Sequence, residues 1–342
     1  MYPTQPKKRK KRLFIRRQSS SPERKPESDS MVETGETPRA VWHPPPWTLE
    51  AGDAISMPPG RPPLGAHVSI AGGLPNAIER GLDMACEAIQ IFVKNNSRWL
   101  GKALMDEEVQ AFRSARAESS IGPVIAHASY LINLAALDPV TLDRSLAALA
   151  DELNRCHRLG LDGLVLHPGA HVGAGTEAGL DRVIASLDSV FGGLPASPPL
   201  PLEITAGQGT VLGSSVDELA TIVDGVAHPD RLGVCLDTCH AFAAGYALDQ
   251  PAGYEAFFDE IDSLLGLGTV GAIHLNDSVG SLASHRDRHA NIGQGEIGTE
   301  LFARLVGDSS LASIPMILET PRWDNGAGHR ADLELLRRFR DG

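Results

Sequence analysis

Short apolar runs alternate with helix-like stretches along the chain from Pro63 onward. The runs have strand length, are continuously apolar and are flanked by Gly or Pro, as expected of parallel strands that are buried on both faces. They cover residues 64–69, 87–93, 123–129, 161–169, 200–205, 231–240, 270–277 and 315–321. Candidate helices lie between them, for example at residues 74–85, 141–160 and 216–226.

This alternation predicts an α/β fold. Eight such units fit a closed (β/α)₈ TIM barrel, which needs roughly 250 residues or more. The alternative is an open, doubly wound sheet, which more often carries a Gly-rich phosphate turn after its first strand. The first turn here reads SIAGGLPNA and does not match that motif. We therefore predict a TIM-barrel domain over residues 61–342.

Residues 1–60 have a different composition, rich in Lys and Arg and then in Pro, Ser and Glu, with few residues that could form a core. This predicts a disordered, basic N-terminal tail. The basic block KKRKKRLFIRR at residues 7–17 is either a solvated extension without a specific role, a nucleic-acid-binding arm or a localisation signal.

Composition narrows the class of protein. No apolar run is long enough to cross a membrane, and no apolar segment follows the basic N-terminus as it would in a secretory signal. Four cysteines in 342 residues are too few for a disulfide framework, so a reducing, cytoplasmic location is expected. The net charge of −12 argues mildly against a nucleic-acid partner, unless local cations such as bound metals compensate.

Side chains that bind metals recur at the ends of the apolar runs. Seven of the eight runs end in or near His, Asp or Glu, and the residues are His67, His127, His167, Glu203, Asp237 with His240 just beyond it, His274 and Glu319. Asp287 and His289 follow in the long loop after the seventh run, where their spacing puts both on one side of an extended segment. The carboxyl ends of barrel strands converge on one face, so these residues are expected to meet there.

Each of these residues alone is more often structural than a ligand. Together, however, they would place several carboxylates in a buried site with almost no Lys or Arg nearby to pair with them. Burying an unpaired charge costs roughly several kcal/mol per ion. Divalent cations would remove that cost, and nitrogen and oxygen donors suit zinc, manganese or iron. Cys235 and Cys239 lack a second cysteine pair, which disfavours a thiolate site. The pattern predicts a site for two or three metal ions.

A multinuclear site favours hydrolysis of a phosphate ester, since adjacent metals supply hydroxide near neutral pH and stabilise the leaving oxygen. Sugar isomerisation or epimerisation on a two-metal barrel is the competing function. It typically relies on a lysine and fewer histidines, so the ligand count favours hydrolysis.

Several long motifs resemble the endonuclease IV family of apurinic/apyrimidinic endonucleases. They are AHASYLINLA, LVLHPGAHVG, LEITAGQGT, GVCLDTCHAFAAGY, IHLNDSVGSLASHRDRHANIGQGEIG and ILETP, and they extend from about Leu64 to beyond Glu319. The resemblance implies three zinc ions, with Mn²⁺ as a possible substitute. The first would be held by His127, His167 and Glu203, the second by Glu203, Asp237, His274 and Glu319, and the third by His240, Asp287 and His289. Cys235 and Cys239 would then only pack.

The resemblance also implies the reaction, with Glu203, Asp237 and Glu319 as catalytic residues. The substrate would be double-stranded DNA with an abasic site or a blocked 3′ end. Cleavage 5′ to the abasic site would leave a 3′-hydroxyl and a 5′-deoxyribose phosphate. No organic cofactor is needed. We expect a monomer that is nucleoid-associated in a prokaryote, or nuclear if the tail is a localisation signal. A DNA-lesion binder without activity is the third possibility, and it is disfavoured because no ligand is missing.

The family's DNA contacts map onto two loops here. Tyr130 and Leu131 match a pair that wedges the duplex, although a role in the core is the alternative. Lys94, Asn95 and Arg98 lie in KNNSRW, where Ser97 stands at the family's usual arginine. Two further departures, Ala128 in place of Asp and Ile204 in place of Asn, are expected to alter support of the metal ligands. His67 is expected to support the site or face the substrate, and His329 to lie on the surface.

Overall fold

A computed structural model describes residues 60–323 and 326–342 of the chain. The predicted tail lies outside the described residues. The predicted boundary between tail and barrel falls at the edge of the described part and stays a prediction.

Eight parallel strands form the sheet, in the order β4-β3-β2-β1-β10-β7-β6-β5. They are β1 (Leu64–His67), β2 (Ala88–Ile91), β3 (Val124–His127), β4 (Gly163–Val165), β5 (Leu200–Glu203), β6 (Leu232–Asp237), β7 (Val270–His274) and β10 (Met316–Leu318). A parallel bridge between Leu166 and Leu202 joins the two ends of this order, between β4 and β5. The predicted (β/α)₈ barrel is confirmed, because the sheet closes on itself.

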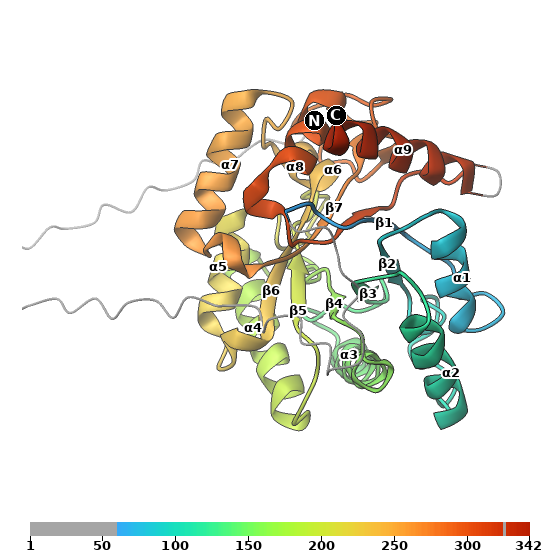
Figure 1. Cartoon of the computed structure of the whole chain (residues 1–342). Coiled ribbons are helices and arrows are strands. Elements are labelled where there is room, and N and C mark those ends of the chain that lie inside the picture. The colour runs from blue at the N-terminus through green and yellow to red at the C-terminus, as the bar shows by residue number, and fades with distance from the viewer. Residues whose placement is uncertain (1–59, 324–325) are drawn as a thin grey trace, which may run out of the picture. The chain divides into compact units, whose positions relative to one another are not determined.

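Helices surround the strands on the outside (Figure 1). They are α1 (Pro75–Asp83), α2 (Asp106–Ala117), α3 (Pro139–Leu159), α4 (Thr176–Gly193), α5 (Val216–Gly225), α6 (Thr238–Ala244), α7 (Pro251–Leu264), α8 (Thr299–Gly307) and α9 (Ala327–Asp341). A large apolar core lies between helices and strands. Among the described residues no helix is long and apolar enough to cross a membrane.

The strands are shorter than the apolar runs that predicted them. The seventh run was expected to continue to Asp277, but β7 ends at His274, and Asp277–Ser278 (β8) pairs instead with His289–Ala290 (β9) in a small antiparallel sheet. The carboxylate of Asp277 accepts hydrogen bonds from the backbone N–H groups of Gly293, Gly295 and Ile297 at 2.9–3.0 Å. This fixes the long loop that carries Asp287 and His289.

A second, smaller apolar cluster consists of Ala88, Ile125, Val165, Cys235, Ala272 and Ile317. Each member lies two residues before a polar residue that is near the end of its strand or just beyond it. Since alternate residues of a strand share a face, this cluster forms the layer directly beneath those polar side chains inside the barrel. The expectation that Cys235 packs agrees with its place in this layer.

Candidate metal centre

The carboxyl ends of the strands bring the predicted ligand residues together. Among the described residues five groups of donor atoms lie close enough to share a metal ion, with the atoms of each group within 4.8 Å of one another, and three of these groups contain only His, Asp and Glu. These three are His127, His167 and Glu203; Glu203, Asp237, His274 and Glu319; and His240, Asp287 and His289. These are the three sets that the resemblance implied, and together they use all nine predicted ligands.

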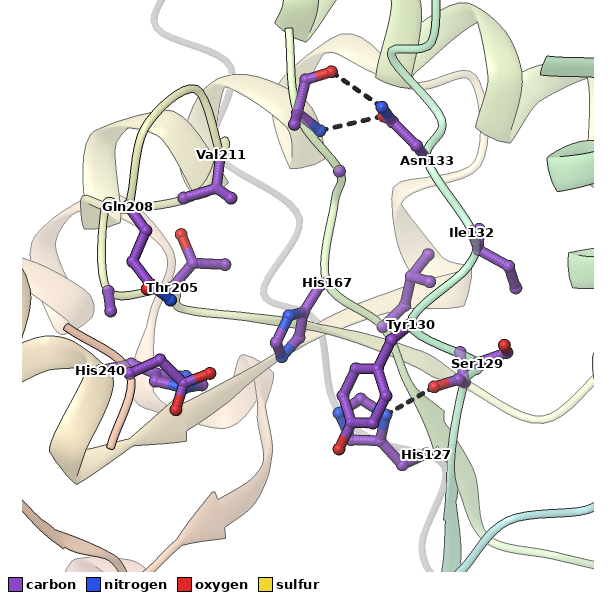
Figure 2. Close-up of a pocket in the computed structure, with 16 residues that line it drawn as sticks. His127, Ser129, Tyr130, Ile132, Asn133, His167, Thr205, Gln208, Val211 and His240 are labelled. Atoms are coloured by element: carbon purple, nitrogen blue, oxygen red, sulfur yellow. Dashed lines mark hydrogen bonds and ion pairs between the residues drawn. The ribbon is translucent and has the colours of Figure 1, made fainter. Parts of the chain in front are cut away.

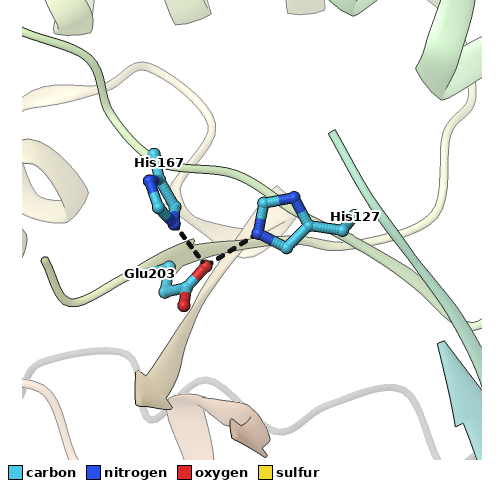
Figure 3. A group of neighbouring side chains, drawn as sticks. All are labelled: His127, His167 and Glu203. Carbon is cyan, nitrogen blue, oxygen red and sulfur yellow. Dashed lines mark hydrogen bonds and ion pairs between the residues drawn. The ribbon is translucent and has the colours of Figure 1, made fainter. Parts of the chain in front are cut away.

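The first group forms around one oxygen of Glu203. The Nε2 atoms of His127 and His167 lie 2.9 and 2.8 Å from Glu203 Oε2 (Figure 3). The other carboxylate oxygen, Oε1, lies 2.9 Å from Nδ1 of His274, which belongs to the second group. Glu203 therefore presents one oxygen to each of two neighbouring groups.

The second group continues from His274 to two further carboxylates. Nδ1 of His274 lies 3.5 Å from Glu319 Oε2 and 3.8 Å from Asp237 Oδ2. Asp237 is the last residue of β6 and the N-cap of α6, and its Oδ1 accepts a hydrogen bond from the backbone N–H of His240 at 2.8 Å. This N-cap holds the carboxylate in place and leaves Oδ2 facing the group.

The third group converges on Asp287. The Nε2 atoms of His240 and His289 each lie 3.3 Å from Asp287 Oδ1. Both nitrogens are buried, and neither has a hydrogen-bond partner within the described residues. Buried polar atoms are nearly always satisfied, and two nitrogens that face one carboxylate oxygen form a donor set that suits a cation.

The opposite nitrogen of three of these imidazoles lies near a backbone carbonyl oxygen. His127 Nδ1 is 2.8 Å from the carbonyl of Ala128, and His289 Nδ1 is 3.3 Å from that of Glu319. His240 Nδ1 is 3.0 Å from the carbonyl of Ile204, closer than the 3.3 Å to Glu203 Oε1. Histidines that bind metals are usually oriented in this way. Because backbone oxygens do the orienting, Ala128 and Ile204 support the ligands without the polar side chains of the family pattern.

Two polar residues of the site were missed: Gln90 lies in none of the motifs, and Asn276 lies in the motif that begins IHLNDS but received no role. Gln90, fully buried in β2, lies 2.9 Å from His274 Nε2 through its Oε1, and its Nε2 donates to Glu319 Oε1 at 2.6 Å. Asn276 donates to Asp237 Oδ2 at 2.7 Å and accepts from the backbone N–H of Glu319 at 2.9 Å. Gln90 lies two residues after Ala88 of the small apolar cluster, and a search for polar residues at that spacing would have found it.

The electrostatics of the cluster favour positive charge. Burial alone would lower the pKa of His127 and His240, but nearby carboxylates, among them Glu203, outweigh it and raise both pKa values. Burial alone would raise the pKa of Glu203, but the adjacent histidines hold it well below its usual range. Cys235 and Cys239 each join a further group of donor atoms, the first with Glu203 and His274 and the second with Asp237 and His289. Burial raises the pKa of both thiols to about 12, which disfavours the thiolate form, and the three groups above are complete without them. Imidazole and carboxylate donors fit a zinc cluster, and they also suit manganese.

A cavity of about 270 Å³ opens beside the donor groups and is lined by His127, Tyr130, His167, His240 and Asp287, among others. Figure 2 shows the three imidazoles side by side at this cavity, with Tyr130 next to His127. The ring centres of Tyr130 and His127 are 5.3 Å apart. Thr205, Gln208 and Val211 form the opposite wall.

The predicted DNA contacts divide into exposed and buried residues. Tyr130 is 62% exposed and Leu131 37% exposed, which excludes the alternative role in the core. Asn95 and Arg98 are also exposed. The Lys94 side chain is buried, however, and its Nζ lies 2.8 Å from Glu152 Oε1.

The buried pair of Lys94 and Glu152 holds the two predicted DNA loops together. Lys94 Nζ donates to the backbone carbonyl of Arg98 at 2.8 Å, and Glu152 accepts from the backbone N–H of Ser129 at 3.1 Å. Ser129 Oγ in turn donates to the carbonyl of Asn96 at 2.6 Å. The Lys94 ammonium is therefore engaged inside the protein, and Asn95 and Arg98 are the residues of this loop that are exposed for a contact with DNA.

Two further histidines have definite places. His67 lies beside the cluster, with Nδ1 3.4 Å from Glu319 Oε1, in agreement with the expected supporting or substrate-facing role. The expectation of a surface position for His329 is wrong. It is 1% exposed, and its Nε2 lies 2.8 Å from the carbonyl of Thr320, because α9 packs over the segment that follows β10.

Comparisons with known proteins place the chain in a class and then in a family. The family model of xylose isomerase-like TIM barrels matches residues 78–339. A D-tagatose 3-epimerase-like protein shares the fold, with a TM-score of 0.60 at 18% sequence identity over 82% of this chain and 98% of the other. The class is therefore a barrel whose known members differ in function, and the likeness to the epimerase-like protein shows the fold alone.

Closer relatives define the family. "Probable endonuclease 4" of Chloroflexus aurantiacus is 46% identical over 282 residues, which cover 82% of this chain and 99% of the relative. "Probable endonuclease 4" of Chloroflexus aggregans is 48% identical over 277 residues, covering 81% and 97%. The crystal structure of endonuclease IV from Thermus thermophilus matches with a TM-score of 0.71 at 39% identity, covering 82% of this chain and 98% of that one. The chain belongs to the endonuclease IV family and is a nuclease.

Proposed function

We propose that this chain hydrolyses the DNA phosphodiester 5′ to an abasic site through a trinuclear zinc centre, leaving a 3′-hydroxyl and a 5′-deoxyribose phosphate. The observation that carries the proposal is the arrangement of nine donors in three contiguous groups, two of which share Glu203, beside a cavity. A third group supports phosphate ester hydrolysis over the two-metal sugar chemistry known on related barrels.

The donor groups assign the ligands. His127, His167 and Glu203 would hold the first ion, Asp237, His274 and Glu319 would complete the second with Glu203, and His240, Asp287 and His289 would hold the third. When bound, the ions would polarise the phosphate and lower the pKa of water. Four carboxylates against three doubly charged ions leave about two positive charges, which attract a phosphate.

The chain's own residues position the metal ions and the substrate. The proposed catalytic residues are three carboxylates of the second group: Glu203, Asp237 and Glu319. They keep the ligand atoms of that group together. Tyr130 and Leu131 stand exposed beside the cavity, where they would wedge the duplex open. Asn95 and Arg98 would contact the backbone from the adjoining loop.

The cavity supports a flipped abasic sugar as the substrate. Its volume of about 270 Å³ lies below the roughly 300–1,000 Å³ of pockets that take larger ligands. A deoxyribose without its base costs the least to flip out of the helix. The same opening would admit the end of a broken strand, so we include the trimming of 3′-blocking groups in the proposal.

One assay tests this function. The zinc-loaded protein is incubated with a duplex that carries a single synthetic abasic site. We expect incision 5′ to that site, and a loss of at least about 100-fold in rate for Glu203→Gln, since one substitution disturbs two metal sites. Glu118→Gln, an exposed carboxylate at the far end of α2, is the matched control and should cut as fast as wild type.

The same assay separates the alternatives. Intact DNA together with turnover of a free ketose would support an isomerase or epimerase. Tight binding without a cut would support a lesion binder. We further propose a monomer that works with DNA in the cytoplasm or nucleoid, or in the nucleus if the basic segment at residues 7–17 is a localisation signal.

A further inference from the structure

A second cavity, of about 400 Å³, adjoins the metal centre on the other side of His67. It lies between the loop after β1 and the segment after β10, and we call it the Arg322 pocket. Its charged and aromatic lining residues are His67, Arg80, Asp83, Arg322, Trp323, His329 and Arg330. His67 lines this pocket and also lies next to the metal centre, since its Nδ1 is 3.4 Å from Glu319 Oε1.

His67 presents an unused hydrogen-bond donor to this pocket. Its Nδ1 lies 3.0 Å from Gln90 Nε2, which is an amide nitrogen and can only donate. When Gln90 donates to it, Nδ1 accepts, and the proton of the ring then resides on Nε2. That Nε2–H is buried, with the side chain 9% exposed, and has no partner within the described residues. A buried donor without a partner calls for an acceptor.

The charges around this donor define the acceptor. The lining residues include three arginines and a single carboxylate, that of Asp83. Arg80 is fixed in place, because its guanidinium donates to the backbone carbonyls of Ser69 and Ala71 at 2.5 and 2.6 Å. An anion with several acceptor oxygens fits this surrounding, and phosphate is the common group of that kind that arginine binds well.

Trp323 stands at the same pocket and is 52% exposed. Its φ of +50° is in the left-handed region, which bulky residues rarely adopt. Strained residues of this kind concentrate at functional sites. An exposed indole beside a phosphate site offers a flat surface on which a sugar or base can stack.

We propose that the Arg322 pocket binds a backbone phosphate of the DNA strand, adjacent to the phosphodiester that is cut. The proposal rests on the proposed function, since the pocket shares His67 with the metal centre and a phosphate there lies next along the strand. His67 Nε2–H and Arg322 bind the phosphate oxygens, and Trp323 packs on the neighbouring nucleotide.

The test compares Arg322→Gln with Arg338→Gln, which removes the same charge from an exposed position near the end of α9. Duplexes with one abasic site carry a single neutral methylphosphonate at successive positions around the scissile bond. Binding is measured by fluorescence anisotropy, and incision is measured separately. We expect R322Q to raise KM several-fold with little change in kcat, and to reduce the salt slope of binding by about one.

The methylphosphonate scan supplies the specific readout. At one position, neutralising the phosphate should weaken DNA binding by wild type and by R338Q. It should not weaken binding by R322Q, because that variant already lacks the contact with this phosphate. If wild type cuts the DNA and R322Q matches R338Q at every position, the pocket proposal is overturned. If wild type does not cut but the scan still singles out one phosphate for Arg322, the pocket stands and the proposed function fails.

Discussion

Gln90 shows how much one buried amide determines at the metal centre. Its two ends are bound in fixed roles, because the nitrogen must donate to Glu319 and the oxygen must accept from His274 Nε2. The proton of His274 is thereby held on Nε2, and Nδ1 is free to face the second donor group. Gln90 is a positioning residue in this arrangement, since it sets the orientation of two proposed ligands.

Gln90→Met, which keeps the volume and removes the hydrogen bonds, should therefore weaken zinc binding. We expect a loss of about 10–100-fold in the affinity for one of the three ions, as is usual when a group that orients a ligand is removed. Competition with a chromogenic chelator measures this without any assay of activity. Gln110→Leu, on the exposed face of α2, is the control. A zinc titration of Q90M that matches wild type would contradict the role assigned to Gln90.

At the scale of elements, the loop after β2 and the loop after β3 behave as one unit. The ion pair of Lys94 and Glu152 has both side chains at most 3% exposed. Lys94 donates to the carbonyl of Arg98 in one loop, and Glu152 accepts from the backbone N–H of Ser129 in the other. Burial raises the pKa of Glu152, although Lys94 opposes that effect. Removing the lysine leaves a buried carboxyl group without its cation.

Lys94→Met should therefore destabilise the protein by about 3 kcal/mol or more, as expected for breaking one side of a buried pair. The double variant K94M/E152Q should recover part of this loss, because no unpaired charge remains. Urea unfolding of both variants measures the difference, with Lys102→Met as an exposed control. Were Lys94 instead a DNA contact, K94M would weaken DNA binding and leave the unfolding midpoint unchanged.

The sequence was sufficient to predict the barrel and the proximity of the nine predicted ligand residues at one face, for a physical reason. Strands buried on both faces produce continuous apolar runs, and the geometry of a closed barrel then places every strand end on one face. What escaped were partners defined only in three dimensions. Gln90 and Asn276 are ordinary polar residues in sequence, Lys94 reads as an exposed cation until Glu152 is seen beside it, and the burial of His329 depends on the packing of α9.

At the scale of the whole molecule, an acidic chain has to attract a polyanion. The net charge is −12, yet the proposed centre would carry about two positive charges, and the Arg322 pocket adds arginines beside it. In this proposal, positive charge is thus concentrated where the DNA backbone would lie. Loss of the metal ions would change the net charge of this centre from positive to negative.

Removal of zinc should therefore lower both stability and DNA affinity without unfolding the barrel. The apolar core between helices and strands contains no ligand residue, so the far-UV circular dichroism should persist after chelation. The melting temperature should fall by of the order of 10 °C, since ions that bind only the folded state stabilise it by mass action. Affinity for the abasic duplex should fall as well. Titrating zinc back should restore melting temperature, binding and incision together, with the end point at about three equivalents. An end point at two equivalents would contradict the proposed third zinc ion. A melting temperature unchanged by chelation would contradict metal binding by the nine donor residues.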